Sequence, residues 1–173
     1  MNLLEFFKPV TSFIFDIDGV LTDGTIQVFE SGEQVRQMSV KDGFALQLAV
    51  KKNYQVAVVS GANGLGAKNR LLKLGIRDVF LQVSDKKKQI EEYLQQHNLQ
   101  WKEVLYMGDD IPDMAALKMA GLPCAPSDAV PEVLQMVKYI STRPGGSGCV
   151  RDVIEKVLRL QGNWDLEAGV SSR

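Results

Sequence analysis

Short apolar runs rich in β-branched residues alternate along the chain with segments whose apolar residues recur at helical spacing. This alternation is typical of βα units and predicts an α/β fold with a mainly parallel sheet flanked by helices. The predicted strands are almost continuously apolar, which suits strands that helices cover on both faces. They are Ser12–Phe15, Gln55–Val59, 79–81 and Val104–Met107.

The helical pattern is clearest near the end of the chain, where Val150, Val153, Ile154, Val157 and Leu158 form one apolar stripe. Such a stripe at helical spacing indicates a helix face buried in the core. The predicted helices are 44–52, 67–74, 86–97, 114–120, 131–137 and 150–160.

Residues 24–39 contain two β-like runs around the turn-like cluster Glu30-Ser31-Gly32-Glu33 and predict a hairpin that projects from the sheet. A two-stranded hairpin is marginally stable alone in water, so we expect it to pack against its own domain or another subunit. Residues 161–173 lose the helical period and predict a tail that is mobile unless it docks. Residues 1–160 are therefore expected to form one domain, with the hairpin as an insertion.

The composition narrows the range of partners. The chain has 173 residues, 45% of them hydrophobic, which is enough to bury the core of one compact domain. Twenty Lys and Arg against twenty-one Asp and Glu give a net charge of −1. The chain therefore lacks the broad basic surface that binds nucleic acid or an anionic membrane, and neither partner is expected.

The sequence also predicts a cytoplasmic protein. Its first residues lack the pattern of a signal peptide, and no apolar run approaches the ~20 residues that span a bilayer. Cys124 and Cys149 lie far apart and outside any CxxC or Cys/His spacing, so we expect two buried thiols rather than a disulfide or zinc site.

Acidic residues follow two of the predicted strands. Asp16 and Asp18 follow the first strand, and the run Gly108-Asp109-Asp110-Ile111-Pro112-Asp113 follows the strand Val104–Met107. The carboxyl ends of parallel strands meet at one sheet edge, where so many carboxylates need a cation, and their hard oxygens favour Mg²⁺. Aspartates also end strands and cap helices, as Asp113 could, but two such clusters at one edge are hard to explain in that way.

Two further strand ends carry groups that suit a phosphoryl group. Ser60 and Gly61 offer a hydroxyl and backbone N–H groups, and Lys86 offers an ammonium. Each alone would be an ordinary serine or surface lysine. Their order along the chain, between the Asp-x-Asp pair and Gly-Asp-Asp, makes a phosphate site the better interpretation.

These residues, in this order, resemble the haloacid dehalogenase (HAD) superfamily of Mg²⁺-dependent phosphatases. Within it, the stretches DGVLTDG, MGDDIPDM and GGSGCVRDVIEKVL look like the small 3-deoxy-D-manno-octulosonate (KDO) 8-phosphate phosphatases. The resemblance implies a Rossmann-like HAD fold. Only the hairpin and one helix separate Asp18 from Ser60, which leaves no room for a cap domain.

The resemblance also implies a role for each motif residue. Asp16 would be the nucleophile that forms an aspartyl-phosphate, and Asp18 the general acid and then the general base. Mg²⁺ would be held by the Asp16 carboxylate, the Asp18 backbone carbonyl and Asp109. The phosphoryl oxygens would be bound by Ser60, Gly61 and Lys86, with Thr22, Asp110 and Asp113 in support.

The chain departs from the sugar-phosphate phosphatase pattern in two loops. Similar sequences usually carry an arginine shortly after the Ser-Gly pair and in a GGRG loop, where this chain has Ala62-Asn63-Gly64 and Gly145-Gly146-Ser147-Gly148. An acidic sugar needs a cationic partner, and the candidates are Arg70, Lys73, Arg143 and Arg151. KDO 8-phosphate, an intermediate of lipopolysaccharide synthesis, is the expected substrate, and a nine-carbon keto-deoxy acid 9-phosphate or another sugar phosphate is the alternative.

Two other classes of protein share parts of this pattern. A response-regulator receiver also surrounds a phosphorylated aspartate with acidic residues, Ser/Thr and Lys, but its acceptor follows a later strand than its acidic pair. A noncatalytic oligomerisation module with a decayed phosphatase fold is the other alternative, and the retention of every catalytic residue type argues against it.

The resemblance finally implies a homotetramer with shared active sites, in which hairpins meet at the centre. The predicted hairpin carries Ile26, Val28, Phe29, Val35 and Met38, more apolar surface than a solvated ribbon should display. The alternative is that these side chains fold back on their own domain. The tail residues Trp164 and Leu166 are expected either to reach a neighbouring subunit or to stay unbound.

Overall fold

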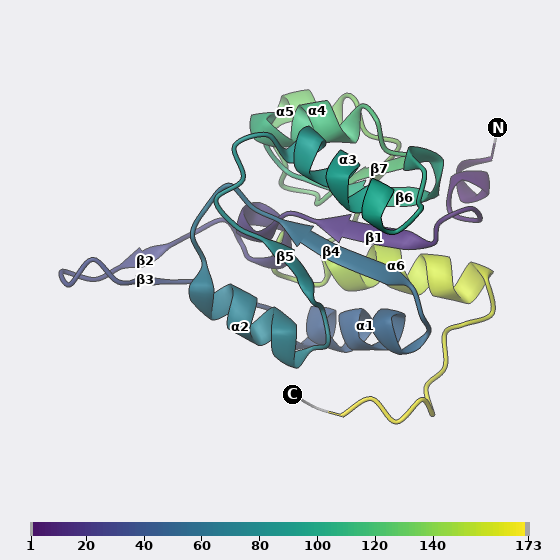
Figure 1. Cartoon of the computed structure of the whole chain (residues 1–173), viewed down its shortest axis with the longest axis horizontal. Helices are drawn as coiled ribbons and strands as arrows, with labels where there is room; N and C mark the ends of the chain where they lie inside the picture. The colour runs from purple at the N-terminus through teal and green to yellow at the C-terminus, as the bar shows by residue number, and fades with distance from the viewer. Residues whose placement is uncertain (1, 172–173) are drawn as a thin grey trace.

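The computed structural model describes residues 2–171 and centres on one six-stranded sheet (Figure 1). Its strand order is β5-β4-β1-β6-β7-β8, and every neighbouring pair is parallel. This confirms the predicted α/β fold. The strands are β1 (Ser12–Phe15), β4 (Gln55–Val59), β5 (Asp78–Phe80), β6 (Val104–Met107), β7 (Leu122–Ala125) and β8 (Tyr139–Ile140).

The helices lie close to their predicted positions. The first begins at Val40 rather than at residue 44, because the Ser39 hydroxyl accepts the N–H of Asp42 at 3.4 Å and caps it. The helices are α1 (Val40–Lys51), α2 (Leu65–Lys73), α3 (Lys86–Gln96), α4 (Met114–Leu117), α5 (Pro131–Leu134) and α6 (Cys149–Leu160). Short helical turns occupy Leu3–Phe6, Ile17–Leu21, Trp101–Glu103 and Ile111–Asp113.

Helices cover both faces of the sheet, with α1, α2 and α6 on one side and α3, α4 and α5 on the other (Figure 1). Successive strand residues point to opposite faces, so β1 contributes to both cores. Phe13 and Phe15 pack in the core under α1 and α6, whereas Ile14 packs in the core under α3 and α4. Both faces of the central strands are therefore buried, as their continuous apolar character predicted.

A long-range polar contact joins α1 to α6. The buried carboxylate of Asp42, in the first turn of α1, accepts the backbone N–H of Arg151 at 2.7 Å and that of Gly148 at 3.3 Å. It therefore caps the start of α6, a helix that lies more than 100 residues further along the chain.

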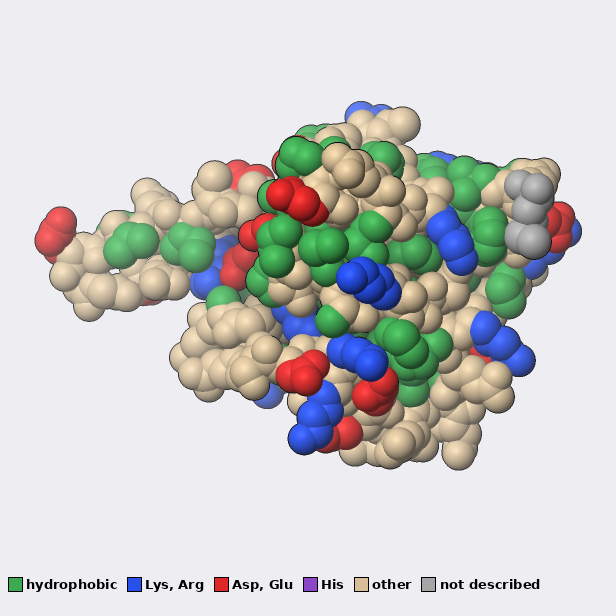
Figure 2. Space-filling model, turned by 90° about the horizontal axis from the view of Figure 1, so that it is seen from above, with side chains coloured by type: hydrophobic (Ala, Val, Ile, Leu, Met, Phe, Trp, Pro, Cys, Tyr) green, Lys and Arg blue, Asp and Glu red, His purple; other side chains and the backbone are tan. Residues whose placement is uncertain are grey.

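The hairpin forms as predicted, with β2 (Gln27–Val28) paired antiparallel to β3 (Gln34–Val35), and it projects from the body of the molecule (Figures 1 and 2). Val28 is 66% exposed and Phe29 46% exposed. These side chains do not fold back on their own domain, whereas Met38, at the base of the hairpin, packs against the core. The projecting part of the hairpin thus displays an apolar surface.

The tail docks on its own chain through Trp164. The Trp164 ring meets Phe44 of α1 edge-on, with 6.1 Å between ring centroids, and the guanidinium groups of Arg151 and Arg159 lie over it. The expectation that Trp164 reaches a neighbour or stays unbound is therefore wrong, although Leu166 is 76% exposed. Residues 172 and 173 of the predicted tail lie outside the described residues.

Both cysteines are free and buried, as predicted. Within residues 2–171, no helix combines the length and the apolar character that crossing a membrane requires.

Candidate active site

The candidate site lies where the strand order reverses. From β1 the sheet continues to β4 on one side and to β6 on the other. Ligands of open α/β sheets bind at such a switch point, at the carboxyl ends of the strands. Because Phe15 pairs with Met107, Asp16 and Asp109 leave the sheet side by side at this edge.

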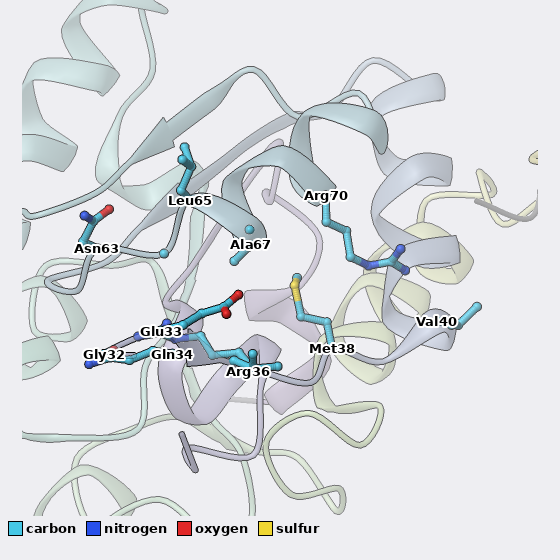
Figure 3. A pocket seen from close by; sticks show the side chains of 13 residues that line it. Gly32, Glu33, Gln34, Arg36, Met38, Val40, Asn63, Leu65, Ala67 and Arg70 are labelled. Atoms are coloured by element: carbon cyan, nitrogen blue, oxygen red, sulfur yellow. The ribbon is translucent and has the colours of Figure 1, made fainter. Parts of the chain in front are cut away.

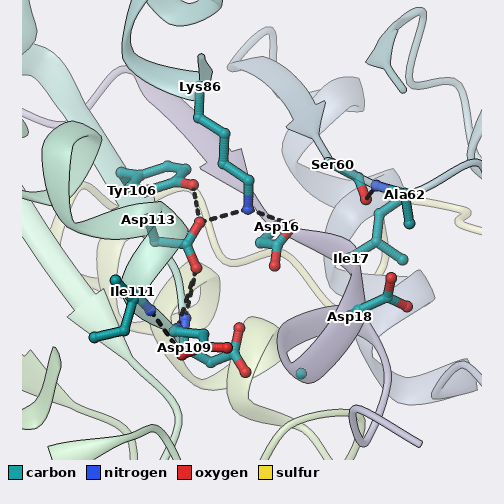
Figure 4. A network of polar contacts seen from close by, with 12 residues as sticks. Asp16, Ile17, Asp18, Ser60, Ala62, Lys86, Tyr106, Asp109, Ile111 and Asp113 are labelled. Atoms are coloured by element: carbon teal, nitrogen blue, oxygen red, sulfur yellow. Dashed lines mark hydrogen bonds and ion pairs between the residues drawn. The ribbon is translucent and has the colours of Figure 1, made fainter. Parts of the chain in front are cut away.

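Lys86, the first residue of α3, connects the two acidic strand ends (Figure 4). Its Nζ lies 3.0 Å from Asp16 Oδ1 and 2.6 Å from Asp113 Oδ1. Burial disfavours its charged form, but the charges of Asp16 and Asp113 outweigh this effect and raise the pKa of Lys86. The structure therefore holds a buried ammonium directly beside Asp16.

Asp113 uses both of its carboxylate oxygens within the chain. Oδ1 accepts from Lys86 and from the Tyr106 hydroxyl at 2.5 Å, and Oδ2 accepts the N–H groups of Asp109 at 3.0 Å and Asp110 at 3.2 Å. The side chain thus fixes the loop that carries Asp109. Tyr106 was missed at the sequence level, because it looks like one more apolar residue of β6.

Asp16 and Asp109 are unusual carboxylates in this structure. Burial, followed by the charge of Asp113, raises the pKa of Asp16 to about 7. Burial, followed by the charges of Asp16 and Asp113, raises the pKa of Asp109 to about 7. Crowded, partly desolvated acids of this kind favour the binding of a cation.

The donor set fits a hard divalent cation. Asp16, Asp109 and Asp113 each place a carboxylate oxygen within 4.8 Å of the others. Oδ1 of Asp109 is buried and has no hydrogen-bond partner within the described part of the chain. Since Asp113 is already committed to four donors, Asp16 and Asp109 are the side chains free to hold a metal, and an all-oxygen set suits Mg²⁺.

The loop after Asp16 is shaped by Gly19 and Thr22. Gly19 has a φ of +91°, and a Cβ there would lie 1.9 Å from Asp109 Oδ2. Only glycine therefore lets this loop approach Asp109. The buried Thr22 hydroxyl accepts the N–H groups of Gly19 and Gly24 and donates to the Ile17 carbonyl, each at 3.3 Å.

Ser60 and Gly61 follow β4, which lies next to β1. Ser60 is 2% exposed, and its Oγ accepts the N–H of Ala62 at 3.2 Å. Figure 4 places Ser60 on the side of Asp16 away from Asp113. The structure thus brings the carboxylates, the ammonium and the hydroxyl to one sheet edge, as the strand-end positions predicted.

Asp18 has a partner that the sequence did not identify. The Arg36 guanidinium, from the base of the hairpin, donates from Nε to Asp18 Oδ1 at 2.6 Å and from Nη2 to Oδ2 at 3.4 Å. Arg36 is well buried, with 7% of its side chain exposed, against 28% for Asp18. An arginine among the apolar residues of a hairpin was the available signal.

Comparison with known proteins identifies the family. A family model for haloacid dehalogenase-like hydrolases matches residues 43–126. The chain is 32% identical to the 3-deoxy-D-manno-octulosonate 8-phosphate phosphatases of Salmonella typhi and Escherichia coli K12, over 95% of its own length and 87% of theirs. The chain belongs to the KDO 8-phosphate phosphatase family.

Solved structures of the family have the same fold. The Yersinia pestis KDO 8-phosphate phosphatase superposes with a TM-score of 0.92 at 29% identity, covering 99% of this chain and 91% of that one. The Moraxella catarrhalis phosphatase, solved with magnesium, phosphate and KDO, superposes with a TM-score of 0.91 at 28% identity, covering 94% of each chain.

The four candidate cations for an acidic sugar do not converge in this family member. Arg70 lines a hollow between the hairpin and α2, and Lys73 lies in the last turn of the same helix. Arg143 and Arg151 line a different hollow beside α6. Arg36 was not among the candidates, yet it lines the first hollow and contacts Asp18.

Proposed function

We propose that the chain is a Mg²⁺-dependent phosphatase that hydrolyses KDO 8-phosphate to KDO and phosphate. The supporting observation is the Asp16, Lys86, Asp109 and Asp113 cluster at the carboxyl ends of β1 and β6. The cluster occurs in a chain that is 32% identical, over 95% of its length, to phosphatases of that name.

In the first step, the Asp16 carboxylate attacks phosphorus and the bond from phosphorus to the sugar oxygen breaks. Asp18 donates a proton to that departing oxygen, and an aspartyl-phosphate remains on Asp16. Lys86 balances the charge of the phosphoryl oxygens, while the Ser60 hydroxyl and the Gly61 N–H donate to them.

In the second step, Asp18 takes a proton from a water molecule as the water oxygen attacks phosphorus. The bond from phosphorus to Asp16 breaks, so the carboxylate is restored and inorganic phosphate leaves. Splitting one displacement into two lets a single residue act first as acid and then as base.

We propose that the Asp16 carboxylate, the Asp18 backbone carbonyl and Asp109 hold Mg²⁺. The bound ion supplies positive charge that lets an anionic carboxylate approach an anionic phosphate ester. Thr22 and Asp113 keep the two ligand loops in position through the hydrogen bonds described above, and Asp110 starts the turn after β6 by accepting the Ile111 N–H at 2.7 Å.

The test is phosphate release from a panel of sugar phosphates with Mg²⁺ and after chelation by EDTA. We expect turnover on KDO 8-phosphate that EDTA abolishes and Mg²⁺ restores. A nine-carbon keto-deoxy acid 9-phosphate is the second member of the panel, because the Ala62-Asn63-Gly64 loop lacks the arginine that similar sequences carry there. A receiver or a noncatalytic module would release no phosphate over multiple turnovers. Absence of phosphate release from every sugar phosphate of the panel would therefore contradict the proposal.

We also propose that the protein is a homotetramer whose subunits complete one another's active sites through the hairpins. The support is the apolar surface that the projecting hairpin displays, with Val28, Phe29, Ile26 and Val35 all at least 39% exposed. Light scattering at micromolar concentration tests this proposal. A fully active monomer would contradict it.

A further inference from the structure

A hollow of about 860 Å³ lies between the hairpin and the N-terminal end of α2, bordered by Arg36, which contacts Asp18 (Figure 3). Its charged lining residues are Arg36 and Arg70, which are cationic, and Glu33 on the exposed hairpin. The inference drawn from this hollow rests on the proposed function. If Asp18 exchanges a proton with the sugar oxygen, the sugar must lie next to Asp18 and therefore next to Arg36.

The Arg36 guanidinium has one edge committed and one edge available. Nε and Nη2 face the Asp18 carboxylate. Nη1 faces the start of α2, where a Cβ built on Gly64 would lie 4.0 Å from it. A guanidinium can bind carboxylates along two edges, so the pair with Asp18 leaves Nη1 able to bind a second acid.

The start of α2, which Arg36 Nη1 faces, has no side-chain cap. Gly64 is the N-cap residue and makes no side-chain cap hydrogen bond, and the first turn contains no acidic residue. This nine-residue helix therefore begins with backbone N–H groups that no side chain caps, and its dipole favours an anion there. Arg36 Nη1 and this helix end face each other across a short gap.

Arg70 is placed differently, although it also lines the hollow. A Cβ built on Gly43 of α1 would lie 3.1 Å from Arg70 Nη2, so this guanidinium is directed against α1. In Figure 3 the Arg70 side chain points away from Asn63 and Gly32, which also line the hollow. Arg36 is therefore the better-placed cation.

We propose that Arg36 Nη1 and the uncapped N-terminus of α2 together bind the carboxylate of the sugar substrate. The site replaces the arginine that similar sequences carry after the Ser-Gly pair with one that comes from the hairpin. Arg36 is then a specificity residue, and it links recognition of the acid group to the residue that protonates the leaving oxygen.

The first test compares KDO 8-phosphate with p-nitrophenyl phosphate, a monoester without a carboxylate, in Arg36→Met and Arg36→Lys. We expect the ratio of kcat/KM for the two substrates to fall about 30-fold or more in Arg36→Met, mainly through KM for KDO 8-phosphate. Arg36→Lys should recover only part of that ratio, because it keeps the charge but lacks the two binding edges of a guanidinium. Arg77→Met, at an exposed arginine before β5, is the matched control.

The second test fills the proposed site from within the chain. The position of Gly64 has room for a side chain, since a Cβ there would lie no closer than 3.7 Å to other atoms. Gly64→Asp places a carboxylate at the helix start beside Arg36, whereas Gly64→Asn places a neutral group of the same shape there. We expect Gly64→Asp to lower the substrate ratio about tenfold more than Gly64→Asn does.

Inhibition of p-nitrophenyl phosphate hydrolysis by free KDO separates this inference from the proposed function. Wild-type protein that hydrolyses the nitrophenyl ester but not KDO 8-phosphate contradicts the proposed function. The inference requires free KDO to inhibit the wild type and Arg36→Met to raise its inhibition constant, with inhibition by inorganic phosphate less affected. Absence of inhibition by KDO in the wild type would overturn the inference. An equal loss of kcat/KM for KDO 8-phosphate and for p-nitrophenyl phosphate in Arg36→Met would overturn it as well.

Discussion

The acidic cluster and the hairpin differ in how far a single chain completes them. In the cluster, Asp113 accepts four hydrogen bonds and Lys86 contacts two carboxylates, in buried or partly buried surroundings. In the hairpin, two strands of two residues each pair with one another and, within residues 2–171, with no further strand, and Val28 is 66% exposed. The contacts of the acidic cluster are therefore formed within one chain, whereas the hairpin has an apolar surface that the described part of its own chain does not cover.

The largest expected effect comes from the cluster. Asp16→Asn keeps the shape of the side chain but cannot form the aspartyl-phosphate, so we expect turnover to fall by about 10⁴-fold or more. The oligomeric state and the thermal unfolding curve should stay close to those of the wild type. Steady-state phosphate release measures the loss, and Asp165→Asn, at a half-buried aspartate of the tail outside the cluster, is the control. Substantial activity in Asp16→Asn would contradict the proposed mechanism.

Asp113→Ala tests whether the cluster is also a structural unit. It removes the acceptor of Tyr106, of two backbone N–H groups and of one Lys86 contact, all of which are buried or partly buried. We expect a loss of about 3 kcal/mol in the free energy of unfolding. This is at the low end of the cost of breaking a buried ion pair, because Lys86 still has its ion pair with Asp16. Urea denaturation measures it, and Asp110→Ala should cost about 1 kcal/mol, as the loss of a turn cap does.

Substitutions in the hairpin should change the oligomeric state rather than the stability of the domain. Charged substitutions, Val28→Glu together with Val35→Glu, place carboxylates on the exposed apolar face and should dissociate the oligomer without unfolding the domain. We expect activity to fall about tenfold or more in parallel with the mass measured by light scattering. Glu30→Gln, at the hairpin tip, is the control. A dissociated variant with full activity would separate assembly from catalysis.

The smallest effect is a pH dependence of the cluster. Since the pKa values of Asp16 and Asp109 are about 7 in the folded chain against an ordinary 3.8, the folded state retains protons that the unfolded chain releases. The metal-free protein should therefore lose stability as pH rises from about 4 to about 7. Mg²⁺ must displace these protons, so its Kd should rise about tenfold or more between pH 8 and pH 5.5. Thermal shifts and calorimetric titration at both pH values measure this, and a pH-independent Kd would contradict it.

Much of the sheet could be predicted because its central strands are uninterrupted apolar runs. β1, β4 and β6 match their predicted bounds, and β5 differs by one residue at each end. The strands β7 and β8, which lie beyond β6 in the sheet, were missed for physical reasons. β7 contains Pro123, which lacks a backbone donor and argues against a strand inside a sheet, and β8 has only two residues, too few to show a period. Their pairing with β6 and with each other creates them.

The residues of the candidate site also differ in how far the sequence predicts their positions. Asp16, Ser60, Lys86 and Asp109 could be placed together because each closely follows an apolar strand of a parallel sheet. The pairing of Arg36 with Asp18 could not, because it spans 18 residues through a hairpin whose register the alternation of apolar residues specifies weakly. A buried phenol needs a partner, but nothing in the sequence of β6 shows that the partner of Tyr106 is Asp113.

The contact of Asp42 with the start of α6 has a consequence for biosynthesis. It joins residues 109 positions apart, and the helix that it caps covers the same sheet face as α1. At a translation rate of about 5–20 residues per second, roughly 5–20 s pass between the synthesis of the two helices. Throughout that interval the apolar face of α1 and the strands beneath it have no cover from α6. We therefore expect the nascent chain to expose apolar surface that chaperones bind, and the core beneath α1 and α6 to close only after α6 has left the ribosome.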